Sequence, residues 1–294
     1  MPLTLLEQNF APLRFRSRYL PLSVTPLHLV YAYDKDGKRV KKKEVRLAKD
    51  MLTKAMIVQK IFDLSFEDAR LNFQYESYFA EKIGDHHPHI ATAIDQYREG
   101  DYGYLTIPYI SGIQLERVIQ DYTILREARA IALTHSILEG LAELHSNGIV
   151  DRDLKPTNII VEPNGLTRII DLDNSWAPEL DSQEKDSNGA SLFVGTPAYA
   201  APEVCACERP LDGRADLYSL GIILYELVTG VVPFLGSETR VLRRQIHEPI
   251  TRIKFEEDNV PLWARPIISK ATEKDRKNRY QSPEAMMRAL PRAA

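Results

Sequence analysis

Residues 151–173 constrain this chain most, because this short segment concentrates the side chains that phosphoryl transfer requires. Asp153 can accept a proton from an attacking hydroxyl, and Lys155 can neutralise charge on a moving phosphoryl group. Asn158 and Asp171 offer hard oxygen atoms, which a magnesium ion on nucleotide phosphates prefers. The segment therefore predicts phosphoryl-transfer chemistry at a single site.

Two apolar runs lie inside this segment, at residues 159–161 and 167–170, and both predict short β-strands. Asn158 comes directly before the first run, and Asp171 comes directly after the second. We therefore expect the two strands to carry these side chains to adjacent strand ends around one ion.

The composition is that of a folded protein. The chain has 294 residues, which suits one large domain or two lobes. Hydrophobic residues make up 44% and charged residues 27%, a balance that excludes wholesale disorder. The net charge of -3 gives no support for a nucleic-acid or membrane-surface partner, and the basic run at 38–43 is local.

The two cysteines, Cys205 and Cys207, are too few for a disulfide framework or a closed zinc site, so a reducing compartment fits. The most apolar stretch, residues 217–235, is interrupted by Glu226 and Pro233, which argues against a membrane span. The N-terminus lacks a basic-then-apolar signal pattern. We therefore expect a cytoplasmic protein.

The first part of the chain reads as strand-rich with one helix. Runs 27–33 and 40–47 flank the turn residues 34–37 and predict a hairpin, and residues 104–107 predict a further strand. Residues 108–112 break this pattern and predict a connector.

One helix is expected in this strand-rich part. Ser65, followed by Asp68, predicts a capped helix that begins near Phe66. Glu76 falls within its apolar stripe, where a carboxylate needs a cation or must reach solvent. The apolar members of the stripe are Ala69, Phe73, Ala80 and Ile83.

Beyond the connector the chain becomes helical. Apolar residues at helical spacing predict helices over residues 125–145 and 217–228, the second of them buried. Two further helices are expected over residues 261–271 and 283–290. Asp153, Asn158 and Asp171 fall past the connector, where we expect a cleft between two lobes.

Several motifs, in order and at matching spacing, resemble those of a bacterial-type Ser/Thr protein kinase domain. They occupy residues 151–158, 171–173, 195–203, 216–234 and 275–282. The resemblance covers about residues 15–290. It implies an α+β, bilobal fold with a β-rich small lobe that has one helix, and a mainly helical large lobe.

The resemblance also implies a domain plan and an activity. Residues 1–294 form a single kinase domain, with the small lobe at about 15–107, the hinge at 108–112 and the large lobe at 113–290. The implied reaction transfers the γ-phosphoryl group of ATP to Ser or Thr hydroxyls of a protein substrate. The implied metal is magnesium, with manganese as an alternative.

Individual roles follow for the large lobe. Asp153 resembles the catalytic base, and Lys155 stabilises the transferred phosphoryl group. Asn158 and Asp171 resemble the metal ligands. Asp216 resembles the residue that braces the backbone of the catalytic loop.

In the small lobe, residues 37–43 resemble the strand that carries the phosphate-anchoring lysine. Register from Gly37 selects Lys43, with Lys42 as the alternative, because a one-residue slip reverses which side chain points inward. Glu76 then pairs with Lys43.

The nucleotide-binding residues continue in the connector. Residues 107–110 resemble the hinge, so Ile107, Pro108 and Ile110 are assigned to ATP binding. Pro108 lacks an N–H but keeps its carbonyl as an acceptor for adenine, and the N–H of Ile110 can donate. Ile160 is assigned to the same nucleotide site.

The segment that docks a protein substrate is also represented. Lys155 and Thr196 match the residues that Ser/Thr kinases carry at these positions. Residues 195–203 resemble the segment on which a protein substrate docks, which argues against a small-molecule phosphotransferase. In the same resemblance, Arg279 pairs with Glu203.

Three features depart from the family pattern. The stretch aligned with the Gly-rich phosphate loop, residues 21–28, contains no glycine. Asp151 stands where the family has His or Tyr, and Asp173 stands where it has Gly. These two acids lie near Asp171 in this fold, so either one of them is protonated or a cation sits between them. A nearby arginine or the bound metal is the less costly of these solutions, because protonation at neutral pH needs a large pKa shift. We hypothesise that the exchange raises the affinity for metal.

These departures leave a second interpretation open, namely a pseudokinase scaffold that binds partners with or without nucleotide. Acceptable residues at the lysine, glutamate, base and metal positions favour activity. Arg152 can hold a phosphorylated residue of the activation segment, and autophosphorylation is predicted. The candidate sites are Ser182, Ser187, Ser191 and Thr196.

Overall fold

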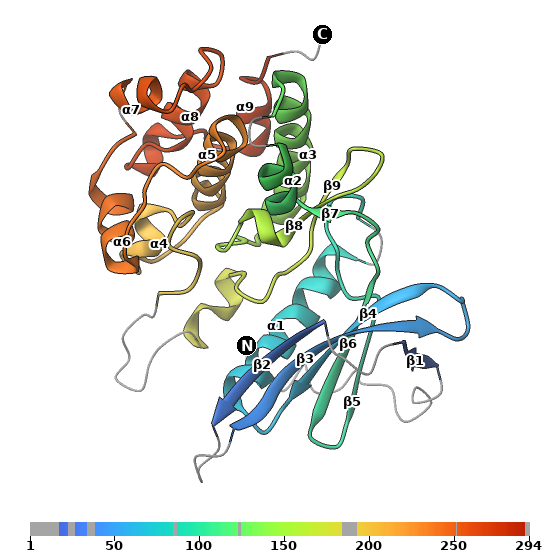
Figure 1. Cartoon of the computed structure of the whole chain (residues 1–294). Helices are drawn as coiled ribbons and strands as arrows, with labels where there is room; N and C mark the ends of the chain where they lie inside the picture. The colour runs from blue at the N-terminus through green and yellow to red at the C-terminus, as the bar shows by residue number, and fades with distance from the viewer. Residues whose placement is uncertain are drawn as a thin grey trace. The chain divides into compact units, whose positions relative to one another are not determined.

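The computed structural model describes residues 18–22, 27–33, 39–84, 87–122, 125–183, 193–250 and 252–291. The chain divides into two compact units. One comprises Met1–His87 with Ala91–Ile110, and the other comprises Pro88–Ile90 with Ser111–Ala294. Each unit is described by itself below (Figure 1).

The first unit is an antiparallel sheet with one helix, α1 (Glu67–Ile83), packed on it (Figure 1). The strand order is β1-β3-β4-β6-β5, and β2 also pairs with β3. The β2–β3 pairing confirms the predicted hairpin, whose turn residues 34–37 lie outside the described residues. The strands are β1 (Tyr19–Pro21), β2 (His28–Tyr33), β3 (Arg39–Asp50), β4 (Met56–Asp63), β5 (Asp95–Glu99) and β6 (Tyr102–Pro108).

Strand β4 was not predicted, and its alternation shows why it forms. Phe62 packs with Phe73 of α1 and with Leu105 of β6. Ile57 has the opposite parity and packs in a second cluster with Tyr97 on the other face of the sheet. Lys60 has the parity of Phe62, so it points to the face that α1 covers.

Helix α1 carries the expected apolar stripe, and Glu76 is buried within it. The predicted cap is wrong, because no side chain caps the helix and its N-cap residue is Phe66. The Ser65 hydroxyl instead donates to the Asp63 carboxylate over 2.6 Å. The Ser65 hydroxyl therefore hydrogen-bonds within the turn before the helix and does not cap the helix.

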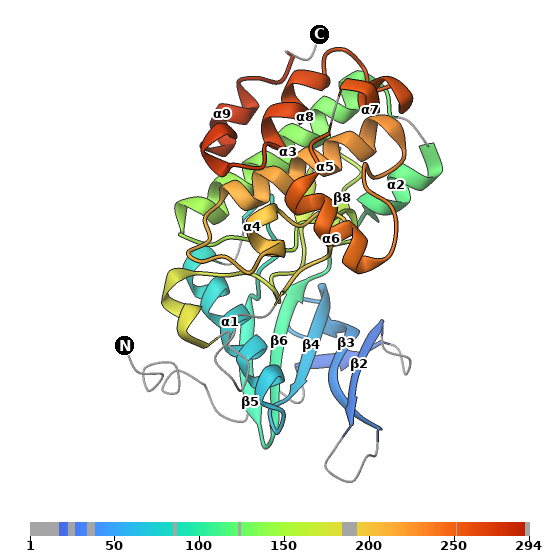
Figure 2. The same ribbon diagram turned by 90° about the vertical axis from the view of Figure 1, so that its left-hand side faces the viewer.

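The second unit is mainly helical, with a small sheet of β7 (Ile113–Gln114), β8 (Ile159–Val161) and β9 (Thr167–Ile169). Helix α3 packs against α5 and α9, and α5 also packs against α8 (Figure 2). The helices are α2 (Leu115–Tyr122), α3 (Glu127–Ser146), α4 (Pro202–Cys205), α5 (Arg214–Thr229), α6 (Glu238–His247), α7 (Arg252–Glu257), α8 (Arg265–Ala271) and α9 (Pro283–Met287).

Helices α3 and α5 confirm the long helices predicted over 125–145 and 217–228, and α5 is almost wholly buried. The two C-terminal helices are shorter than predicted, since residues 261–264 form a turn before α8 and α9 ends at Met287. The mixed architecture confirms the predicted α+β class. Within the described ranges, every helix is too short or too polar to span a bilayer.

Candidate functional site

The Asp153 carboxylate lies at the centre of a hydrogen-bond network in the second unit. It accepts hydrogen bonds from Lys155 Nζ over 2.6 Å, from Thr196 Oγ1 over 2.6 Å and from Asn174 Nδ2 over 3.0 Å. Lys155 Nζ also donates to Thr196 Oγ1 over 2.9 Å. These contacts fix the carboxylate in one orientation and bring a cation and a hydroxyl to it. Sequence reasoning expected Lys155 nearby but missed Asn174, which lies 21 residues away.

Asp216 anchors the backbone of the loop that carries Asp153. The Asp216 carboxylate accepts the backbone N–H groups of Asp151 over 2.9 Å and of Arg152 over 2.8 Å. His145 Nε2 lies 2.8 Å from the same carboxylate. Arg152 has a φ of 64°, a conformation that persists in non-glycine residues where the surroundings impose it. The expected bracing by Asp216 is confirmed.

Asn158 and Asp171 lie at adjacent strand ends, as predicted. Strands β8 and β9 pair antiparallel, and the Ile170 N–H donates to the Asn158 carbonyl over 3.0 Å. Asn158 Nδ2 donates to the Asp153 carbonyl over 3.3 Å, which turns the amide oxygen the other way. An amide oxygen and a carboxylate are ligands of the kind that suit a divalent cation such as magnesium.

Asp151 is a buried acid with an unusual environment. Only 1% of the residue is exposed, one carboxylate oxygen accepts the Asp153 N–H over 3.1 Å, and the other has no hydrogen-bond partner among the described residues. Burial, together with the charges of Asp216, Asp153 and Asp171, raises the pKa of Asp151 well above its usual value. The raised pKa agrees in direction with protonation, which is one of the two solutions predicted for this acid.

In the first unit, Glu76 receives two lysines. Lys60 Nζ lies 2.6 Å from one Glu76 oxygen, and Lys43 Nζ lies 3.8 Å from the other. The predicted Lys43–Glu76 contact is present, but Lys60 makes the shorter one, which has hydrogen-bond length. Sequence reasoning missed Lys60 because it missed β4. The apolar residues at 56–58 and 61–62, on either side of Gln59 and Lys60 and shortly before the helix of Glu76, would have revealed it.

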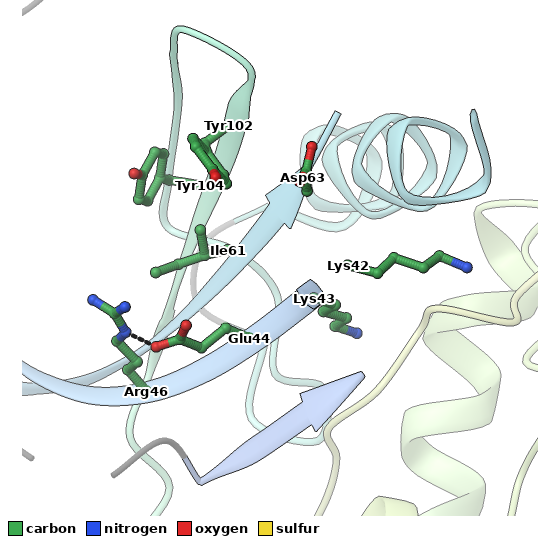
Figure 3. Close-up of a pocket in the computed structure, with 8 residues that line it drawn as sticks. All are labelled: Lys42, Lys43, Glu44, Arg46, Ile61, Asp63, Tyr102 and Tyr104. Carbon is green, nitrogen blue, oxygen red and sulfur yellow. Dashed lines mark hydrogen bonds and ion pairs between the residues drawn. The ribbon is translucent and has the colours of Figure 1, made fainter. Parts of the chain in front are cut away.

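Lys42, the alternative to Lys43, contacts Asp68 at the start of α1 instead of Glu76. Figure 3 shows the Lys43 side chain leaving β3 on the side away from Ile61 and Tyr104. Ile61 and Tyr104 line a cavity of about 370 Å³, together with the Glu44–Arg46 contact. Lys43, which contacts Glu76, also lines this cavity, whereas Lys60 and Glu76 do not.

The residues assigned to adenine binding occur in both units. Ile107 is buried in β6, where it pairs with Val58, and Pro108 ends the same strand. Ile110 is the last residue of the first unit and is half-buried. Ile160 is half-buried in β8 of the second unit.

Two contacts hold the segment around Thr196. Arg279 makes a two-pronged ion pair with Glu203, each contact 2.7 Å long, which confirms the predicted pairing. Gln245 of α6, which sequence reasoning missed, donates to the carbonyls of Pro197 over 3.2 Å and of Ala198 over 2.7 Å. A segment fixed in this way can present a constant surface to another chain.

Of the four predicted phosphorylation sites, only Thr196 has a described side chain. Ser187 and Ser191 lie outside the described residues, and the side chain of Ser182 is not described either. The Thr196 hydroxyl is held between Asp153 and Lys155.

Comparison with known proteins identifies the class. Residues 41–290 match the family model of the protein kinase domain, and the chain belongs to this family. It is 35% identical over 196 residues to the probable serine/threonine-protein kinase CPE1738 of Clostridium perfringens, covering 66% of this chain and 28% of that one.

Two further relatives cover more of the chain. It is 30% identical to the probable serine/threonine-protein kinase PknB of Lactococcus lactis, over 79% of this chain and 36% of that protein. It is also 30% identical to the serine/threonine-protein kinase PrkC of Bacillus subtilis, over 82% of this chain and 37% of that protein. The chain thus spans about a third of the length of these relatives.

Proposed function

We propose that this chain is an ATP-dependent protein kinase that phosphorylates Ser or Thr. The observation that carries the proposal is the network of Asp153, Lys155 and Thr196, in which a carboxylate and a cation share one hydroxyl. That hydroxyl occupies the kind of position that the hydroxyl of a protein substrate would take. Membership of the protein kinase family supports the same activity.

The residues of the second unit act on the acceptor hydroxyl. Asp153 orients the hydroxyl and takes its proton, while the amide of Asn174 holds the carboxylate in place. Lys155 lies within hydrogen-bond distance of Asp153 and balances negative charge on the transferred group.

The residues of the first unit hold the nucleotide. The short contact to Glu76 favours Lys60 as the lysine that binds the α- and β-phosphates, with Lys43 as a second cation. Ile107, Pro108 and Ile110, together with Ile160 of the second unit, contribute to binding of the adenine.

Asn158 and Asp171 hold magnesium, with manganese as the alternative metal. When bound, the metal and ATP supply charge neutralisation and the phosphoryl group itself. The domain plan stays as predicted, with the small lobe at about 15–107, the hinge at 108–112 and the large lobe at 113–290. A cytoplasmic location also stays a prediction.

A phosphotransfer assay tests the proposal against the pseudokinase alternative. The protein, incubated with labelled ATP and either magnesium or manganese, should label itself or a generic protein substrate, and Asp171→Ala should abolish the label. A scaffold would give no label, although ATP and metal would still raise its melting temperature. Mass spectrometry of the labelled protein should find phosphate on Ser182, Ser187, Ser191 or Thr196.

A further inference from the structure

Helix α6 presents a basic face to solvent. Arg240, Arg243, Arg244 and His247 follow one another at steps of three, one and three residues, and at about 100° per residue these steps keep them on one side of the helix. All but the half-buried Arg244 are exposed. We call this set the α6 basic face.

The charge of this face is only partly balanced. Glu248 makes a two-pronged contact with Arg244, each arm 2.7 Å long, and Arg240 contributes to the lowered pKa of Glu248 after Arg244. Glu238 lies on another side of the helix, since five residues separate it from Arg243. Among the described residues, no carboxylate forms an ion pair with Arg240 or Arg243. The face therefore keeps an excess of positive charge on a chain whose net charge is -3.

The basic face lines a hollow of about 570 Å³ together with Ser237, Thr239, Pro249 and Glu248, the last of which is paired with Arg244. A concave surface of this size accommodates several side chains of an extended segment. Guanidinium groups bind carboxylates through paired, charge-assisted hydrogen bonds. The hollow therefore suits a stretch of chain that is rich in Asp and Glu.

The opposite face of α6 makes hydrogen bonds to the segment around Thr196. Gln245 donates to the carbonyls of Pro197 and Ala198, and its own side-chain oxygen accepts the Tyr218 hydroxyl over 2.6 Å. Lys274 Nζ donates to the Tyr218 hydroxyl and to the Gln245 carbonyl, each over 2.8 Å. A segment bound to the outer side of α6 is thus held in a fixed relation to the residues next to Thr196.

We propose that the α6 basic face docks an acidic segment of the protein substrate, separate from the residue that is phosphorylated. This inference rests on the proposed kinase function and names a substrate class for it. Docking through charge raises the local concentration of the acceptor near Asp153 without adding to the chemistry there.

A binding experiment tests the surface without catalysis. A fluorescent peptide rich in Asp and Glu is titrated with the whole protein, and anisotropy is followed at low and at high salt. R240E/R243E should bind about tenfold more weakly than the unmodified protein, because two attractive charges become repulsive. K277E/R288E makes the same change in net charge at two other exposed cations and should bind as the unmodified protein does.

A kinetic experiment ties the surface to substrate choice. Two peptides share one acceptor serine, and one of them carries an acidic tail. The tail should lower KM about tenfold with kcat unchanged, and R240E/R243E should remove this advantage and leave the tailless peptide unaffected.

Equal binding by both double variants would overturn the docking inference, and so would tighter binding of a single-stranded oligonucleotide than of the acidic peptide. Phosphorylation of both peptides with the same KM would also overturn it, while the proposed kinase function would stand. Failure of the unmodified protein to phosphorylate either peptide would instead overturn the proposed function, and the anisotropy would still report on the surface.

Discussion

The two units place their key carboxylates in different ways. In the second unit, Asp153 receives three donors, and one of them, Lys155, lies two residues along the same loop. In the first unit, Glu76 receives two lysines from separate strands of the sheet, and Lys60 is 16 residues away. Only Lys155 is local, because Asn174 and Thr196 lie 21 and 43 residues from Asp153, and both lysines of Glu76 depend on strand register. Sequence analysis accordingly predicted the local donor Lys155 but missed Asn174 in the second unit and Lys60 in the first.

The largest effect on kcat is expected at Asp153, the carboxylate of the second unit that receives three donors. Asp153→Asn keeps an oxygen acceptor but cannot take a proton, so kcat should fall about a thousandfold. Steady-state phosphotransfer measures the loss, and an unchanged melting temperature shows that the fold survives. Retention of most of the activity would mean that Asp153 is not the base.

The two lysines of the first unit test the register directly. Lys60→Met should lower kcat/KM for ATP about 100-fold, because it removes the short contact to Glu76 and a cation for the phosphates. Lys43→Met, the matched control, should lower it at most about threefold, since its contact to Glu76 is 3.8 Å long. The reverse order of effects would restore Lys43 as the anchoring lysine.

The amide of Asn174 tests how far the network around Asp153 extends. Asn174→Ala removes one of three donors to a charged acceptor, so kcat should fall about tenfold with KM for ATP unchanged. The backbone carbonyl of Asn174, which accepts from Arg152 Nε over 2.7 Å, stays in place in this variant. A large rise in KM for ATP would show that Asn174 serves nucleotide binding instead.

The smallest effect concerns stability at Asp151. Its pKa is raised in the folded state, so the folded protein binds more protons than the unfolded chain at any pH between the two pKa values. Its contribution to stability is therefore greatest at low pH and declines as the pH rises from about 3.9, the unfolded value, through the folded value. Asp151→Asn mimics the neutral form and should flatten this decline.

Urea unfolding at a series of pH values measures how the free energy of unfolding changes with pH in the unmodified protein and in Asp151→Asn. Identical slopes in the variant and the unmodified protein would show that Asp151 is ionised in the folded state, as a bound cation would require.

The sequence by itself determined the long helices and the catalytic segment. The periodic apolar pattern of α3 and α5 extends over many turns, and burial of one stripe or of a whole helix leaves few alternatives. Asp153, Lys155 and Asn158 lie within six residues, so one tight loop and the short 3-10 helix Pro156–Asn158 fix their relation. The family resemblance added the distant pairing of Arg279 with Glu203.

Only the tertiary structure decided which lysine lies closest to Glu76, that Asn174 supports Asp153, and that Gln245 joins α6 to the segment around Thr196. It also decided the direction in which the pKa of Asp151 is shifted, because that pKa depends on burial and on carboxylates from other parts of the chain. The physical reason is common to all four. Strand register and burial bring together groups that are far apart in the sequence, and no local pattern encodes those distances.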